Sequence, residues 1–220
     1  MYQELSETET GTSVGLGPLK MLLCGHQRSL VVSIGVASLN AVGFYLVLTY
    51  LPTYFSNELG FNSRESFLSV NISLLFYLLA IFAMGWLSDR IGRKRMLVAA
   101  SVGFVLFSVP LFMVMGTGQL WKACLAEGAL CLFLTANDGT MASYLAESFP
   151  TELRYTGFAV SQNLANAVFG GTASAVCTWV IGVSGSRLAP AWYLAAVSLL
   201  SLCAMVASHE HTGRDLSEVA

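Results

Sequence analysis

Residues 85–94 read Gly85-Trp86-Leu87-Ser88-Asp89-Arg90-Ile91-Gly92-Arg93-Lys94, a charged turn between two long apolar runs. Residues 66–88 and residues 96–121, on either side of Asp89–Arg95, contain no Asp, Glu, Lys or Arg. A glycine at position 85 would let another backbone approach closely, and Gly92 would supply a tight turn. The stretch therefore predicts a hairpin that joins two long apolar helices.

Four more apolar runs lie outward from this hairpin, at residues 29–57, 123–146, 155–186 and 188–208. Two charged residues, Glu127 and Asp138, interrupt the run at 123–146, and the other three runs contain none. About 20 apolar residues cross the hydrocarbon core of a bilayer as a helix. Only a helix satisfies every backbone polar group within one such run. We therefore predict an all-α membrane protein with six transmembrane helices.

The composition agrees with a membrane protein and excludes several other classes. Hydrophobic residues make up 55% of the chain and charged residues 11%, whereas a soluble domain carries about 25% charged residues. The net charge of −2 provides no basic excess for nucleic acid. The five cysteines are scattered, without a CxxC pair or a Cys/His cluster. We expect no disulfide framework, no metal and no cofactor.

The lysines and arginines predict the orientation of the helices, because cytoplasmic loops are enriched in them. With the N-terminus in the cytoplasm, eight lie on the cytoplasmic side: Lys20, Arg28, Arg90, Arg93, Lys94, Arg95, Arg154 and Arg214. Three lie on the other side: Arg64, Lys122 and Arg187. Residues 1–28 are then a cytoplasmic N-terminal segment, residues 29–208 a six-helix bundle and residues 209–220 a cytoplasmic tail. The bundle would consist of two three-helix units of opposite topology, as in inverted-repeat transporters.

The hairpin resembles a known signature. Residues 85–94 match the major facilitator superfamily pattern G-x-L-[SA]-D-R-x-G-R-[KR] at every defined position. Residues 144–157, Y-L-A-E-S-F-P-T-E-L-R-Y-T-G, and residues 50–54, Y-L-P-T-Y, resemble the C-terminal half of its metabolite:proton symporter family. That family includes carriers of proline, betaine, citrate, 2-oxoglutarate and shikimate. The resemblance covers nearly the whole chain and implies helices seven to twelve, which form half of a major facilitator fold.

The resemblance implies a transporter rather than an enzyme: proton-coupled symport of a small polar or carboxylated metabolite or osmolyte across the plasma (inner) membrane, by alternating access. Such transporters have twelve helices, and the first six have no counterpart here. The expected partners are therefore the lipid bilayer, a small-molecule substrate with a proton, and an N-terminal six-helix half. Three interpretations stay open: a fragment of a full transporter, a half-transporter that assembles with a partner half or with itself, or a non-transporting remnant or interaction module.

A charge network is predicted at the cytoplasmic ends of the helices. Glu147 and Arg154 flank a loop that Pro150 turns, and their spacing resembles another facilitator motif. Together with the hairpin they suggest a cytoplasmic gate network of Gly85, Asp89, Arg90, Gly92, Arg93, Glu147 and Arg154. Such a network would hold the helix ends together in one state and release them in the other. The alternative is a set of surface ion pairs, each worth about 0–1 kcal/mol, that only fix topology.

Two acids inside a predicted span are candidates for proton coupling. Asp138 and Glu127 are separated along the helix so that they lie within about 20° of one face. Ionisable groups at this depth are costly and suggest function by default. Glu127 could instead reach the outer interface near Lys122, and Asp138 could instead form a buried hydrogen bond to a neighbouring helix.

Amides and tyrosines inside the spans are candidates for the wall of a substrate cavity. Asn163 and Asn166 share i, i+3, i+7 spacing with Gly170. They could form a helix–helix seam or line a wet cavity. The weaker candidates of the same kind are Asn40, Tyr45, Asn71 and Tyr77.

One further motif points to an enzyme and is set aside. Gly182-Val183-Ser184-Gly185 matches the GxSG of rhomboid-type intramembrane proteases. A nucleophilic serine needs a base within hydrogen-bond reach, and the later histidines are predicted at the opposite membrane face. The motif fits a loop in which Gly and Ser are ordinary turn residues.

Overall fold

The computed structural model describes residues 17–208, and within this range all regular secondary structure is helical. The elements in chain order are α2 (Gly17–Gly25), α3 (Gln27–Gly43), η1 (Phe44–Tyr50), α4 (Leu51–Asn57), α5 (Ser63–Ile91), α6 (Arg93–Met115), α7 (Leu120–Glu147), α8 (Arg154–Ala165), η2 (Asn166–Gly170), α9 (Gly171–Ser184) and α10 (Ala189–Ala207). The π-helical segments η1 and η2 each continue the helices on both sides of them. Residues 1–16 of the predicted N-terminal segment 1–28, and the whole predicted tail 209–220, lie outside the described residues.

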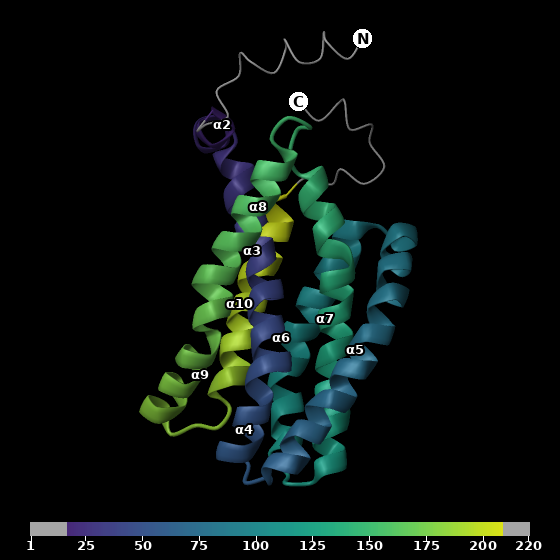
Figure 1. The fold of residues 1–220 in the computed structure, drawn as a ribbon, viewed down its shortest axis with the longest axis vertical. Coiled ribbons are helices and arrows are strands. Elements are labelled where there is room, and N and C mark those ends of the chain that lie inside the picture. The colour runs from purple at the N-terminus through teal and green to yellow at the C-terminus, as the bar shows by residue number, and fades with distance from the viewer. Residues whose placement is uncertain (1–16, 209–220) are drawn as a thin grey trace, which may run out of the picture.

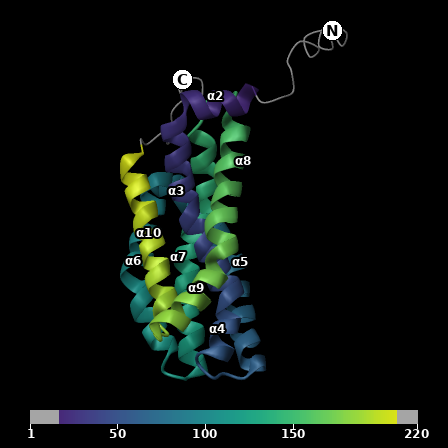
Figure 2. The ribbon, with the colours of Figure 1, turned by 90° about the vertical axis from the view of Figure 1, so that its left-hand side faces the viewer.

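The long helices run up and down in one elongated bundle (Figure 1). α7 packs against both α5 and α6, while α10 packs against α6 and α3, and α3 packs against α8. The α5–α6 turn, the α7–α8 loop and the end of α10 gather at the end of the bundle that α2 crosses (Figure 2). We call this the hairpin end, since it contains residues 85–94.

The membrane character of the bundle is clear from its helices. Within the described residues, five helical segments are long and apolar enough to cross a membrane: Gln27–Asn57, Ser63–Ile91, Arg93–Met115, Arg154–Ser184 and Ala189–Ala207. The sixth predicted span, α7, is not among them, and Glu127 and Asp138 lie within it. The all-α membrane fold is therefore confirmed. That α7 also crosses the membrane is inferred only from its position between α5 and α6.

The two hairpin glycines have the roles that the sequence predicts. Gly92 has a φ of 106°, in a region that side chains disfavour, and it both ends α5 and precedes α6. Gly85 lies where α5 meets α7, and its partner there is Gly139. A Cβ atom added at Gly139 would lie 3.0 Å from the backbone nitrogen of Gly85 and 3.0 Å from the carbonyl oxygen of Ile81. Two glycines thus let α5 and α7 touch backbone to backbone.

The GxSG motif forms a turn, as expected. Gly185 has a φ of 66° and ends α9 in the left-handed conformation. The Ser184 hydroxyl donates a hydrogen bond to the Val180 carbonyl of its own helix at 2.6 Å. These contacts are those of a helix C-terminus.

Candidate functional site

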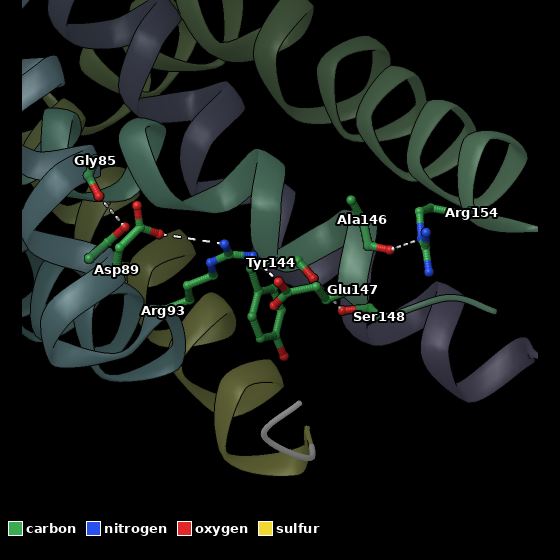
Figure 3. Close-up of polar contacts among 9 residues, drawn as sticks. Gly85, Asp89, Arg93, Tyr144, Ala146, Glu147, Ser148 and Arg154 are labelled. Carbon is green, nitrogen blue, oxygen red and sulfur yellow. Dashed lines mark hydrogen bonds and ion pairs between the residues drawn. The ribbon is translucent and has the colours of Figure 1, made fainter. Parts of the chain in front are cut away.

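An ionic network lies at the hairpin end, centred on Arg93 (Figure 3). Arg93 is the first residue of α6, and its guanidinium pairs with Glu147 at the end of α7. The same guanidinium lies 3.5 Å from the Asp89 carboxylate on the last turn of α5. The Arg93 and Glu147 side chains are 23% and 19% exposed, whereas Asp89 is 67% exposed. The better shielded pair is therefore the one that joins α6 to α7.

Two residues of the predicted network make other contacts instead. The Arg90 guanidinium lies over the Trp86 ring of its own helix, 3.9 Å from the ring centroid. Arg154 points away from Arg93 (Figure 3) and donates to the Ala146 carbonyl at 2.8 Å. Arg154 therefore ties down the loop between α7 and α8, and the structure does not bring it to Asp89 or Arg93.

Two basic residues bind the C-terminal end of α10, a role that the sequence analysis did not assign. Arg28 donates to the Ala207 carbonyl at 3.2 Å, and Lys94 donates to the Ser208 carbonyl at 2.5 Å. The last carbonyls of a helix lack intrahelical donors and attract cations. α10 is thus linked to α3 and α6 at the hairpin end. In the sequence, both residues contribute only to the count of lysines and arginines that predicts the orientation of the helices.

A polar seam runs between α5 and α7 inside the bundle. The Ser69 hydroxyl donates to Glu127 at 2.7 Å, and the Tyr77 hydroxyl donates to Asp138. The two acids therefore share one face of α7, as their spacing predicts. Ser69, Ser73 and Tyr77 recur every four residues on α5, a signal that could have identified the facing helix.

The two acids differ in their surroundings. Glu127 is fully buried, so it does not reach toward Lys122 and the outer interface. Asp138 is only partly buried, near the middle of the bundle's length. Within the described residues, each carboxyl has one oxygen without a hydrogen-bond partner. The unpartnered oxygen of each carboxyl is itself buried, so both carboxyls lie inside the α5–α7 seam, although the Asp138 residue as a whole is partly exposed.

The amide and tyrosine candidates separate into contacting and exposed groups. Gln162 on α8 donates to Asn40 on α3 at 3.1 Å, which links two spans. Asn71 is exposed and donates to the Phe67 carbonyl of its own helix at 2.7 Å. Tyr45 packs against Gly170, where an added Cβ would lie 2.7 Å from its ring.

The three residues at i, i+3, i+7 spacing differ in their burial. Asn163 is exposed, Asn166 is partly buried and Gly170 is buried. Between Asn166 and Gly170 the chain is π-helical, and a π-helical turn contains more residues than an α-helical turn, so α-helical spacing does not describe that step.

Comparison with known proteins places the chain in a family. The Major Facilitator Superfamily profile matches residues 30–217. The chain is 30% identical, over 97% of its length, to the proline/betaine transporter of Escherichia coli, and covers 44% of that protein. It is 33% identical, over 80% of its length, to the glycine betaine/proline/ectoine/pipecolic acid transporter of Dickeya dadantii, and covers 35% of it.

The chain thus spans less than half the length of these relatives, whose names are those of transporters and not of enzymes. The family match, the helical bundle and the apolar spans all agree. The chain belongs to the Major Facilitator Superfamily and is a multi-pass, all-α membrane protein.

Proposed function

We propose that this chain acts as one half of a twelve-helix transporter that carries a small zwitterionic osmolyte together with a proton. The relatives are named for glycine betaine, proline, ectoine and pipecolic acid, compounds that each combine a cationic nitrogen with a carboxylate. The other half would be an N-terminal six-helix unit. Both termini would lie in the cytoplasm, because the arginines of the hairpin end obey the positive-inside pattern. The bundle would lie in the plasma membrane.

The observation that carries the proposal is the ionic network at the hairpin end. Arg93 connects α6 to Glu147 on α7 and to Asp89 on α5, so three helix ends depend on one guanidinium. Partly exposed pairs of this kind contribute about 0–1 kcal/mol each. A gate needs contacts of this size, since the free-energy difference between its two states, a few kcal/mol, must change sign in each transport cycle.

Proton coupling is the finer part of the proposal, and Asp138 is the residue that we assign to it. Asp138 is partly exposed as a residue at mid-depth, Tyr77 donates to one of its oxygens, and its other oxygen is buried without a partner. A carrier must exchange its proton with both sides, which an enclosed acid such as Glu127 does less readily. A carboxyl at this depth relieves its cost by pairing or by taking up a proton.

The proposal is tested by pairing the chain with the N-terminal six-helix half of the Escherichia coli proline/betaine transporter in one membrane. We expect the pair to accumulate labelled glycine betaine when the outside is acidic, and a protonophore to abolish the accumulation. The N-terminal half alone is the control. Uptake no greater than that control, with both halves shown to be present and associated, would contradict the transporter proposal and favour a remnant or interaction module.

The chain expressed without any partner half is expected to catalyse no concentrative uptake. One half supplies only one wall of a cavity that alternating access requires between two halves. The measurement is proton-driven accumulation of glycine betaine in vesicles that contain only this chain, shown to be monomeric. Accumulation in those vesicles would show that a single half is sufficient.

Replacing Glu147 with Gln is expected to open the hairpin end in the paired transporter. Loss of one partly buried pair of about 1 kcal/mol should shift the population of the two states about fivefold. Asp89→Asn should shift it in the same direction by less, because Asp89 is more exposed. Cysteine accessibility at both ends reports the populations.

The matched control for the gate is Glu152→Gln. Glu152 is an exposed acid in the neighbouring loop and has no ion pair within the described residues. If Glu147→Gln and Glu152→Gln leave accessibility equally unchanged, the network is only a topological anchor.

A further inference from the structure

Three aromatic rings form a row at mid-depth on one face of the bundle. Phe44 and Tyr45 begin η1, near the middle of the span Gln27–Asn57, and Tyr77 lies near the middle of α5. The Phe44 ring centroid lies 6.0 Å from that of Tyr45 and 6.5 Å from that of Tyr77, both edge to face. Phe44 and Tyr45 are 42% and 37% exposed. Tyr77 is only 8% exposed, so Phe44 and Tyr45 present the open ring surface of the row, at the depth at which transporters of this architecture bind their substrates.

The backbone beside this row is unusual. Phe44 and Tyr45 lie in the π-helical segment η1, and the Tyr45 ring rests against Gly170, the last residue of η2. Single π-helical turns are rare and often occur at functional sites. Here two of them are in contact. Gly170 is required there, because any side chain would displace the Tyr45 ring.

A groove with several hydroxyl-bearing residues in its lining lies beside η1. It lies between η1–α4 and α9, and its lining residues are Thr49, Tyr50, Thr53, Ser174, Ala175, Thr178 and Trp179. Thr49 follows Tyr45 by four residues, and Ser174 follows Gly170 by four residues. Residues of both elements that follow or end the π-helical contact thus contribute to the lining of the groove.

The charges of the described residues indicate which end of a zwitterion this face attracts. From α3 onward, every described Lys and Arg lies in a loop or in the first or last turn of a helix. The middle of the bundle therefore provides no cation for a carboxylate. Aromatic ring faces attract cations instead, and clusters of rings bind quaternary ammonium groups.

We infer that the exposed rings of Phe44 and Tyr45, with the buried ring of Tyr77 packed against Phe44, form a subsite for the cationic nitrogen of the transported zwitterion. This assignment rests on the proposed function and adds to it the orientation of the substrate. The ammonium end faces this chain, and the carboxylate end faces away from it. The rings hold the substrate, whereas Asp138, which Tyr77 contacts, is left for the proton.

The test compares glycine betaine with tert-butylacetate, a molecule of the same shape in which an uncharged carbon replaces the positively charged nitrogen. Displacement of labelled glycine betaine is measured on the 220-residue chain in lipid nanodiscs, alone and paired with the N-terminal half. The unmutated chain should prefer glycine betaine by about 5- to 30-fold. Phe44→Leu and Tyr45→Leu should each reduce that preference at least about threefold, and Phe44→Tyr should retain it.

The matched control is Phe82→Leu, since Phe82 is 80% exposed on α5 and makes no ring contact within the described residues. It should leave the preference unchanged. An unchanged preference in Phe44→Leu and Tyr45→Leu, or no binding to either preparation, would overturn the subsite. Uptake by the pair is scored separately. If the pair takes up betaine but the ring variants have no effect, the transporter proposal stands and the subsite proposal is wrong. If binding depends on the rings but the pair shows no uptake, the subsite proposal stands and the transporter proposal is wrong.

Discussion

Replacing Asp138 with Asn in the paired transporter is expected to abolish accumulation of glycine betaine while substrate exchange continues. In a one-proton symporter, each unit of pH difference drives about tenfold accumulation, because one pH unit corresponds to about 1.4 kcal/mol. Accumulation should rise as the outside becomes more acidic than the inside. Without an ionisable group at position 138, the ratio should stay near one at every pH difference.

Two variants separate proton coupling from a static hydrogen bond. Glu127→Gln alters the other acid of the same α7 face, and it should retain accumulation because Glu127 is enclosed beside Ser69. Tyr77→Phe removes the hydrogen bond but keeps the Asp138 carboxyl, and it should also retain accumulation. If Asp138→Asn matches the unmutated pair in accumulation and in pH profile, Asp138 is structural and another residue couples the proton.

Replacing Gly139 with Val is expected to lower the thermal unfolding midpoint of the chain by about 2 to 12 °C. A Cβ at this position would lie 3.0 Å from backbone atoms of Gly85 and Ile81, and backbone atoms cannot rotate away as a side chain can. α5 and α7 would have to separate along the seam that contains both acids. Overpacking of this kind costs about 1–3 kcal/mol, and each kcal/mol shifts the midpoint of a domain of this size by about 2–4 °C.

The same helix offers a control for this prediction. Gly128→Val changes another glycine of α7, at a position where an added Cβ meets nothing within 4 Å. It should change the midpoint far less, since only the loss of helix propensity by a β-branched residue remains. Equal effects at Gly128 and Gly139, measured by thermal unfolding in detergent, would show that the α5–α7 contact is not limiting for stability.

The features that the sequence predicts well are those that depend on local chemistry. Gly92 needs a positive φ to end α5, and its position between charged residues is visible in the sequence. The shared face of Glu127 and Asp138 follows from helical spacing and is confirmed by their common contacts with α5. The family follows from the residues of the hairpin, and the profile match confirms it.

The features that the sequence does not predict depend on how the helices rotate against one another. Spans that are apolar all round give no strong preference for one face, so the row of Phe44, Tyr45 and Tyr77 could not be recognised. The π-helical segments, which meet where Gly170 contacts Tyr45, alter the spacing beyond them. The contact of Arg154 with the Ala146 carbonyl depends on a loop conformation that charge counting does not describe.

The most direct test of proton-coupled transport is proton movement that accompanies substrate entry. The chain paired with an N-terminal half is reconstituted in vesicles that contain a pH-sensitive dye, with no initial pH difference. Adding glycine betaine outside should acidify the interior, and Asp138→Asn should remove the acidification while betaine still enters. Betaine entry without acidification in the unmutated pair would contradict proton symport by this protein.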